Sequence, residues 1–146
     1  MAARYFILQS SCALCVDHTA DTVYVDAAAR VVFHEDWAVH GHVMVVAREH
    51  VENLSALSDP SAFMSVYVRA EQALLEATGC ERAIVMKLGI MTPHLHLHIY
   101  PVAASASRAE VMAAIDGKTR VPRDEALIDQ VRYALSRGIQ RPTSRV

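Results

Sequence analysis

The stretch that most constrains this chain is PHLHLHIYP, residues 93–101, in which three histidines alternate with apolar residues. Successive side chains of a β-strand point to opposite faces, so the alternation predicts a strand with one apolar face. Leucine and isoleucine then enter the core, and the imidazoles line the other face about 6.5–7 Å apart along the strand. The imidazoles belong to His94, His96 and His98. Histidine at three successive positions of one strand face favours a functional site over a solvated face that happens to use histidine.

Two kinds of chemistry use a row of imidazoles. Neighbouring histidines on one face can share a metal ion, because neutral imidazole is a good ligand. Alternatively, one neutral imidazole can attack an electrophilic phosphorus while another donates a proton or stabilises the developing charge. The alternation alone does not choose between a metal site and a nucleophilic site.

The remaining segments predict an α+β domain. Strands are mostly successive in the sequence and helices are added to them, which favours an antiparallel sheet of about five strands. The clearest helix is capped by Ser58 or Asp59, has Pro60 in its first turn and ends at Gly79. We expect one long helix on the sheet and helices towards the C-terminus. The predicted strands are 22–26, 30–35, 42–47, 82–88 and 94–100, and the later helices are about 107–116 and 123–137.

Length and composition favour a single domain over residues 1–146, with an N-terminal segment 1–20 and a helical C-terminal extension 103–146. The formal net charge of −2 gives no general attraction to nucleic acid or to a membrane. Apolar runs are too short to span a bilayer, and the first ten residues lack the pattern of a signal peptide. We therefore expect a cytoplasmic protein without nucleic-acid or membrane partners.

Two segments carry a resemblance to a known family. HLHLHIY resembles the histidine-triad signature of the HIT superfamily, and GHVMVVAREH (41–50) resembles its second conserved run, with His42 and His50 eight residues apart. The resemblance spans roughly residues 10–101. It implies a HIT-like fold, a homodimer, and a phosphohydrolase or nucleotidyl transferase acting on a nucleoside phosphate. The implied substrates are dinucleoside polyphosphates or phosphoramidates.

The resemblance also implies roles for the histidines. His96 matches the nucleophile that forms a nucleotidyl–imidazole intermediate, and His98 matches the histidine that contacts the transferring phosphate. His42 matches a supporting histidine on a neighbouring strand, and His94 matches the first triad histidine, which orients the site. A two-step displacement through a phosphoramidate replaces one difficult hydrolysis with two easier transfers. No catalytic metal is expected on this mechanism.

Cys12 and Cys15 form a C-x-x-C pair, which by itself is a weak signal and is compatible with two buried thiols. In one bacterial branch of the HIT family, such a pair joins two histidines around zinc. The matching histidines here are His50 and His94. A Cys₂His₂ set suits a closed, tetrahedral, structural zinc ion, so we expect zinc at these four residues.

The segment before the triad, KLGIMTPH (87–94), departs from the family pattern. Ile90 and Met91 stand where polar residues often hold phosphates, which leaves Thr92 and backbone amides as candidate phosphate donors. Glu35 is the best match to the acidic residue that binds ribose hydroxyls in this family, with Asp36 as the alternative.

The other aromatic and histidine side chains carry no motif. Trp37 either stacks on a base or packs in the core. His18 and His34 are interpreted as surface residues.

Two other functions stay open. A nucleotide-binding module with little turnover is favoured by the short apolar segment. A metalloenzyme would instead use the H-x-H pair of His96 and His98 as catalytic metal ligands.

Overall fold

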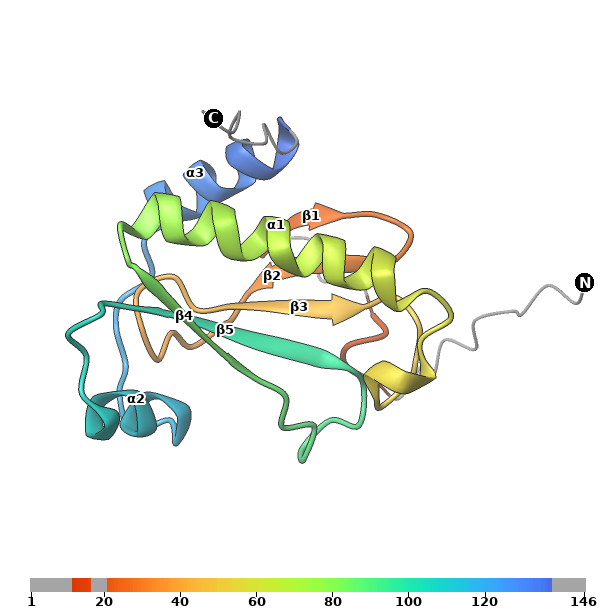
Figure 1. The fold of residues 1–146 in the computed structure, drawn as a ribbon, viewed down its shortest axis with the longest axis horizontal. Helices are drawn as coiled ribbons and strands as arrows, with labels where there is room; N and C mark the ends of the chain where they lie inside the picture. The colour runs from red at the N-terminus through yellow and green to blue at the C-terminus, as the bar shows by residue number, and fades with distance from the viewer. Residues whose placement is uncertain (1–11, 17–20, 138–146) are drawn as a thin grey trace, which may run out of the picture.

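A five-stranded antiparallel sheet forms the centre of the protein (Figure 1). This computed structural model describes residues 12–16 and 21–137. The strand order is β1-β2-β3-β5-β4, so β1 and β4 are the two edges of the sheet. The strands are β1 (Thr22–Val25), β2 (Ala29–Phe33), β3 (Val43–Ala47), β4 (Arg82–Met86) and β5 (His96–Val102). The predicted α+β class and sheet are confirmed.

The helices follow their local signals. A short 3₁₀-helix, η1 (Leu54–Ala56), precedes α1 (Pro60–Thr78), and α2 (Arg108–Ile115) and α3 (Glu125–Ser136) come after the sheet. Asp59 caps α1 by accepting a hydrogen bond from the Ala62 amide at 3.0 Å, and Gly79 ends it in the left-handed conformation. Ser107 and Glu110 form a capping box on α2. The long helix and both later helices are therefore confirmed, with shifts of one or two residues at their ends.

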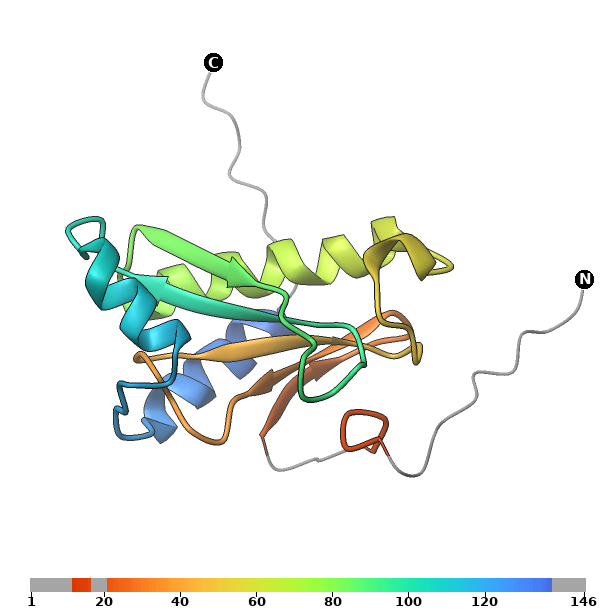
Figure 2. The same ribbon diagram turned by 90° about the horizontal axis from the view of Figure 1, so that it is seen from below.

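The main core lies between α1, α3 and one face of the sheet (Figure 1). Leu95, Leu97 and Ile99 all enter this core, as the alternation predicts. On the opposite face, α2 covers the far end of β5 with a smaller apolar cluster that includes Tyr100, Val102 and Ala114 (Figure 2). The histidine side chains of β5 therefore lie on a face that α1 and α3 leave uncovered.

Several strand boundaries differ from the prediction, most clearly those of β5 and β4. The last strand begins at His96 instead of His94, because the His94 amide donates to the Thr92 carbonyl at 2.8 Å in a turn after Pro93. It also continues through Pro101 to Val102. Proline is tolerated there because β3 begins at Val43, opposite Ile99, so one side of β5 has no paired strand at Pro101. The strand predicted to end at residue 88 ends at Met86.

Gly41 turns the chain into β3 and positions the histidine that follows it. Its φ of 90° lies in the left-handed region that only glycine adopts without strain. A Cβ atom at this position would lie 3.0 Å from Thr78 Cγ2 and 3.2 Å from Leu74 Cδ1. Both the conformation and the close approach of α1 therefore require glycine directly before His42.

Within the described ranges, the helices are too short or too polar to cross a lipid bilayer. His18, residues 1–11 of the predicted N-terminal segment and residues 138–146 of the predicted C-terminal extension lie outside the described residues.

Candidate active site and metal site

Four imidazoles form a continuous group on the sheet face opposite α1, and we call them the histidine cluster. The ring centroids of His96 and His98 are 5.0 Å apart, and those of His98 and His42 are 5.2 Å apart. His34 stacks on His42 with centroids 4.5 Å apart. The other side of His42 is close to Tyr100, at 4.4 Å between centroids. Two of the rings come from β5, and two come from the segments that end β2 and begin β3.

His96 is held by a hydrogen bond to the main chain. Its Nδ1 lies 2.6 Å from the carbonyl oxygen of His94, and the side chain is 8% exposed. Because a carbonyl oxygen can only accept, Nδ1 must carry the proton of the neutral ring. The second nitrogen, Nε2, is then left with a free lone pair, which is the form that a nucleophilic or metal-binding imidazole needs.

His42 and His98 are neutral near pH 7. Burial, with the nearby imidazoles of His34 and His98, lowers the pKa of His42 to about 3. Burial, with His96 and His34 nearby, lowers the pKa of His98 to about 4. His42 Nε2 and His98 Nδ1 are 2.9 Å apart, so one of these two nitrogens donates a hydrogen bond to the other. Burial also raises the pKa of the neighbouring Tyr100, which keeps its phenol protonated.

The four predicted metal ligands lie together at one end of the sheet. Cys12 comes from the turn 12–16 with Cys15, His50 follows β3, and His94 precedes β5. Their ligand atoms all lie within 4.8 Å of one another. Figure 2 shows the turn and the β4–β5 connection at the same end of the sheet.

The distances between the ligand atoms of this cluster fit a tetrahedrally coordinated ion. The Sγ atoms of Cys12 and Cys15 lie 3.6 Å and 3.4 Å from His94 Nδ1. Cys15 Sγ is 3.0 Å from His50 Nδ1, and the two Nδ1 atoms are 3.2 Å apart. Zinc bond lengths imply edges of about 3.5 Å between sulfur and nitrogen and about 3.3 Å between two nitrogens. The set is therefore compatible with zinc.

His94 also has the orientation that a metal ligand needs. Its Nε2 lies 2.7 Å from the Ala47 carbonyl, so Nε2 donates its proton there and Nδ1 presents its lone pair to the cysteines. Burial is the main reason that the pKa of His94 lies below its ordinary value. Residue 94 thus belongs to both sites: its side chain lies in the metal cluster, and its carbonyl accepts from His96.

The family model of the HIT domain matches residues 17–104, which is more than half of the chain. The chain belongs to the HIT family.

Solved structures agree on the fold. This HIT protein is similar to a zinc-bound histidine triad family protein from Mycobacterium smegmatis, at 20% identity and TM-score 0.64 over 87% of this chain and 94% of that one. It is similar to a hypothetical histidine triad nucleotide-binding protein from Sulfolobus tokodaii, at 20% identity and TM-score 0.61 over 80% and 84% of the two chains. A HIT family hydrolase from Clostridium thermocellum matches at 17% identity and TM-score 0.53 over 68% and 97%.

The family's predicted nucleotide-binding residues lie at the two ends of the histidine cluster. Glu35 is exposed beside His34, and Thr92 is half-buried in the turn before β5. Asp36, the alternative to Glu35, forms an exposed ion pair with Arg120 at 3.3 Å. Trp37 packs in the core, where it is 1% exposed and stacks on Phe33, so it is not available to a base.

Two residues near the sites were missed by sequence reasoning. His34, interpreted as a surface residue without a motif, is half-buried and belongs to the cluster, because it stacks on His42 and lies 5.6 Å from His98 between ring centroids. Arg30 is 3% exposed and donates from Nη2 to the Leu14 carbonyl at 2.6 Å, which holds the C-x-x-C turn against β2. A charged residue directly before the apolar run 31–33 was the available signal for Arg30.

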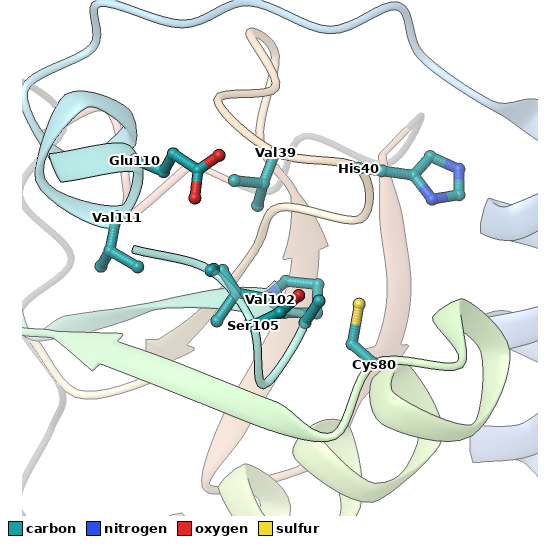
Figure 3. A pocket seen from close by; sticks show the side chains of 10 residues that line it. Val39, His40, Cys80, Val102, Ser105, Glu110 and Val111 are labelled. Atoms are coloured by element: carbon teal, nitrogen blue, oxygen red, sulfur yellow. The ribbon is translucent and has the colours of Figure 1, made fainter. Parts of the chain in front are cut away.

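A separate hollow of about 330 Å³ lies at the other end of β5, beside α2 (Figure 3). Figure 3 shows the Cys80 thiol turned towards it. Its lining includes Val39, Cys80, Val102, Ser105, Glu110 and Val111 and none of the histidine cluster. The hollow of this HIT protein is therefore separate from its histidine cluster.

Proposed function

We propose that this protein is a nucleotidyl hydrolase or transferase that acts on a nucleoside phosphate of the dinucleoside polyphosphate or phosphoramidate type. The observation that carries the proposal is the 2.6 Å hydrogen bond from His96 Nδ1 to the His94 carbonyl. In the neutral tautomer that this bond selects, the Nε2 lone pair is free, and the ring lies on the sheet face opposite α1. Membership of the HIT family and the neighbouring imidazoles support the same reaction class.

The reaction proceeds in two displacements at phosphorus. His96 Nε2 attacks, a P–N bond forms, and the bond to the leaving group breaks with its electron pair going to the departing oxygen or nitrogen, which takes up a proton. Water then attacks the same phosphorus and loses a proton. The P–N bond to His96 breaks and the electron pair returns to Nε2, which frees the nucleotide.

His98 acts as a hydrogen-bond donor to the phosphate. The Ala38 amide donates to His42 Nδ1 at 3.5 Å, which assigns the proton of the His42 ring to Nε2. His42 then donates to His98 Nδ1, and His98 carries its own proton on Nε2. The cluster thus offers a lone pair on one ring and an N–H on the next, so attack and charge stabilisation come from adjacent side chains.

The nucleoside and the metal occupy different ends of the sheet. Glu35 accepts hydrogen bonds from ribose hydroxyls, and Thr92 with nearby amides contacts the phosphates. Cys12, Cys15, His50 and His94 would hold zinc. Bound there, zinc would crosslink the turn 12–16 to the end of β3 and the start of β5, and it would take no part in the displacement.

The protein acts as a homodimer in the cytoplasm, where the cysteines stay reduced for metal binding. The free edge of β4 supports a dimer, because an antiparallel edge strand can pair with a second copy of itself. Val85 on β4 is 44% exposed. Val85→Glu should give a monomer in sedimentation velocity, whereas Val25→Glu on the opposite edge should not. A dimer that survives Val85→Glu would place the interface elsewhere.

A nucleotide-binding module with little turnover is the second candidate, supported by the apolar segment that holds Ile90 and Met91. A metalloenzyme that uses His96 and His98 has weaker support. Among the described residues, the group of three or more side chains that could hold one ion is the Cys₂His₂ cluster, which contains neither of them.

Intact-mass spectrometry tests the proposal. The protein is incubated with adenosine and guanosine phosphoramidates and dinucleoside polyphosphates, and the reaction is quenched at alkaline pH. We expect an acid-labile nucleotidyl adduct that is lost in His96→Asn and kept in His40→Asn, an exposed histidine outside the cluster. An adduct that persists in His96→Asn would refute the nucleophile. Binding without adduct or product would establish the binding module.

A further inference from the structure

His34, His42 and Tyr100 form a row of three rings across the sheet, and we call them the ring stack. The amide of His34 donates to the carbonyl of His42 at 3.0 Å, which extends the pairing of β2 with β3 by one residue. The register that pairs Val43 with Ile99 likewise places His42 opposite Tyr100 of β5. Residues opposite each other in antiparallel strands project to the same face, so backbone pairing brings the three rings together.

The ring stack limits how the ring of His42 can turn. His34 covers one face of this ring at 4.5 Å between centroids, and Tyr100 covers the other at 4.4 Å. The Ala38 amide contacts Nδ1 of His42 at 3.5 Å, which is long for a hydrogen bond. Because the outer torsion of a histidine side chain has a broad energy well, so long a contact leaves the ring able to tilt. The flat surfaces on both sides remove that freedom.

Both ends of the ring stack are fixed to the main chain. His34 Nδ1 lies 2.7 Å from the carbonyl oxygen of Asp36 and 3.1 Å from the amide nitrogen of the same residue. The ring of His34 therefore has a main-chain partner in either tautomer. Tyr100 is 4% exposed and pairs with Ile84 of β4, so the sheet holds its backbone. His42 thus lies between two anchored rings.

The orientation of His42 decides which nitrogen of His98 carries the proton. His42 Nε2 lies 2.9 Å from His98 Nδ1 and donates to it in the proposed mechanism. A neutral imidazole has one N–H, so a donor at Nδ1 keeps the proton of His98 on Nε2, where it can reach the phosphate. If the ring of His42 tilted away, both tautomers of His98 would be populated. The form without a proton on Nε2 could not donate to the phosphate.

From this geometry we infer that His34 is a positioning residue of the proposed reaction. Anchored by Asp36, its ring holds His42 against Tyr100 and so keeps the His42 proton aimed at His98. The inference rests on the proposed function and adds a residue to it. The contribution of His34 is its flat ring, which acts on the phosphate donor through His42.

Two substitutions separate the ring of His34 from its nitrogens. His34→Leu fills a similar space without a flat face, whereas His34→Phe keeps the flat face and removes both nitrogens. Two-bond ¹H–¹⁵N correlation spectra at pH 7.5, where His42 and His98 are neutral, distinguish protonated from unprotonated ring nitrogens. We expect a proton on Nε2 of His98 in the wild type and in His34→Phe, and a mixture of both tautomers in His34→Leu. His40→Leu, outside the ring stack, should keep the wild-type tautomer.

Turnover of a substrate that labels His96 is the second measurement. Loss of one hydrogen-bond donor to a transition state costs on the order of 100–1,000-fold in kcat. Because His34→Leu keeps part of the His98 population in the donating tautomer, we expect a smaller loss of about tenfold in kcat with little change in KM. His34→Phe should retain most of the wild-type kcat, and His40→Leu should equal the wild type. Should leucine prevent folding, His34→Ala takes its place with the same expected results.

Each other outcome overturns the inference or the function on which it rests. A wild-type His98 tautomer or an unchanged kcat in His34→Leu would show that the ring stack does not position the phosphate donor. A raised KM in both His34→Leu and His34→Phe would show that a nitrogen of His34 contacts the substrate, which contradicts a positioning role. No adduct and no turnover in the wild type would refute the proposed function, whereas the spectra would still decide whether the ring stack sets the tautomer of His98.

Discussion

The ring of His34 lies flat against the ring of His42, with an angle of 5° between their planes and 4.5 Å between their centroids. His42 in turn contacts His98 through the 2.9 Å hydrogen bond. A charge on the His34 ring is therefore felt by His42 and His98, and it favours the neutral form of both.

Replacing His34 with phenylalanine should raise the pKa values of both His42 and His98, because a phenyl ring keeps the stacking and removes a group that can become positive. The check is an NMR titration of the histidine ring protons, in which a larger fraction of His98 should be protonated at pH 5 than in the wild type. His40→Gln, outside the cluster, should leave the titration unchanged. Identical curves for His34→Phe and wild type would refute the electrostatic coupling.

Acid should destabilise the fold through the two buried histidines. Their pKa values of about 3 and about 4 lie below the ordinary histidine value of about 6.5, so the unfolded chain binds more protons below pH 6.5. The free energy of unfolding should therefore be highest above pH 6.5 and should fall as the pH drops from there towards 3. Each group contributes a slope of up to about 1.4 kcal/mol per pH unit.

Urea unfolding at pH 7.5, 6.5, 5.5 and 4.5, with a metal chelator in every sample, measures this slope. In His42→Phe, one of the two groups is gone, so the slope between pH 6.5 and 4.5 should be shallower. A slope that is the same in both proteins would show that other groups cause the acid sensitivity.

Replacing one thiol of the Cys₂His₂ cluster should reduce both metal binding and thermal stability. Cys12→Ser removes one of four ligand atoms, so zinc content measured by plasma mass spectrometry should fall well below the wild-type value, and the Tm should fall with it. Cys80→Ser is the matched control, because Cys80 lies beside α2 and outside the cluster. Equal zinc contents in the two variants would contradict the assignment of the metal site.

Gly41→Ala should destabilise the protein more than the same change at Gly117. Both positions have positive φ, at 90° and 69°, so both variants suffer backbone strain of about 1–2 kcal/mol. Only the Cβ at position 41 meets a neighbour, 3.0 Å from Thr78 Cγ2, whereas nothing lies within 4 Å at 117. Overpacking should add at least about 1 kcal/mol at position 41, measurable by urea unfolding at pH 7.5, and equal losses would refute the close approach.

The parts of the fold that follow a simple period were predictable. Alternation along β5 placed Leu97 in the core and His96 and His98 on the other face, because a strand has no other way to arrange them. Asp59, Pro60 and Gly79 marked the ends of α1, because capping is a local interaction between residues close in sequence.

The residues that sequence reasoning missed depend on contacts between distant segments. His34 joins the cluster only because β2 and β3 pair and bring it over His42, and nothing in its own neighbourhood of the sequence signals that stacking. Arg30 resembles a solvated charge until the C-x-x-C turn covers it and offers the Leu14 carbonyl. The four metal ligands were found through the family resemblance, since residue spacing alone left the cysteines compatible with ordinary buried thiols.

The proton on His96 is fixed by a main-chain oxygen, and this has a consequence for redesign. Every amino acid has that carbonyl, so the side chain at position 94 is free to change as long as the backbone stays where it is. A different potential metal ligand such as cysteine could replace the imidazole there and offer a sulfur atom to the Cys₂His₂ cluster, while the neighbouring ring kept the same tautomer. The two sites share residue 94, but one uses its side chain and the other uses its carbonyl. Each site can therefore be engineered without changing the other.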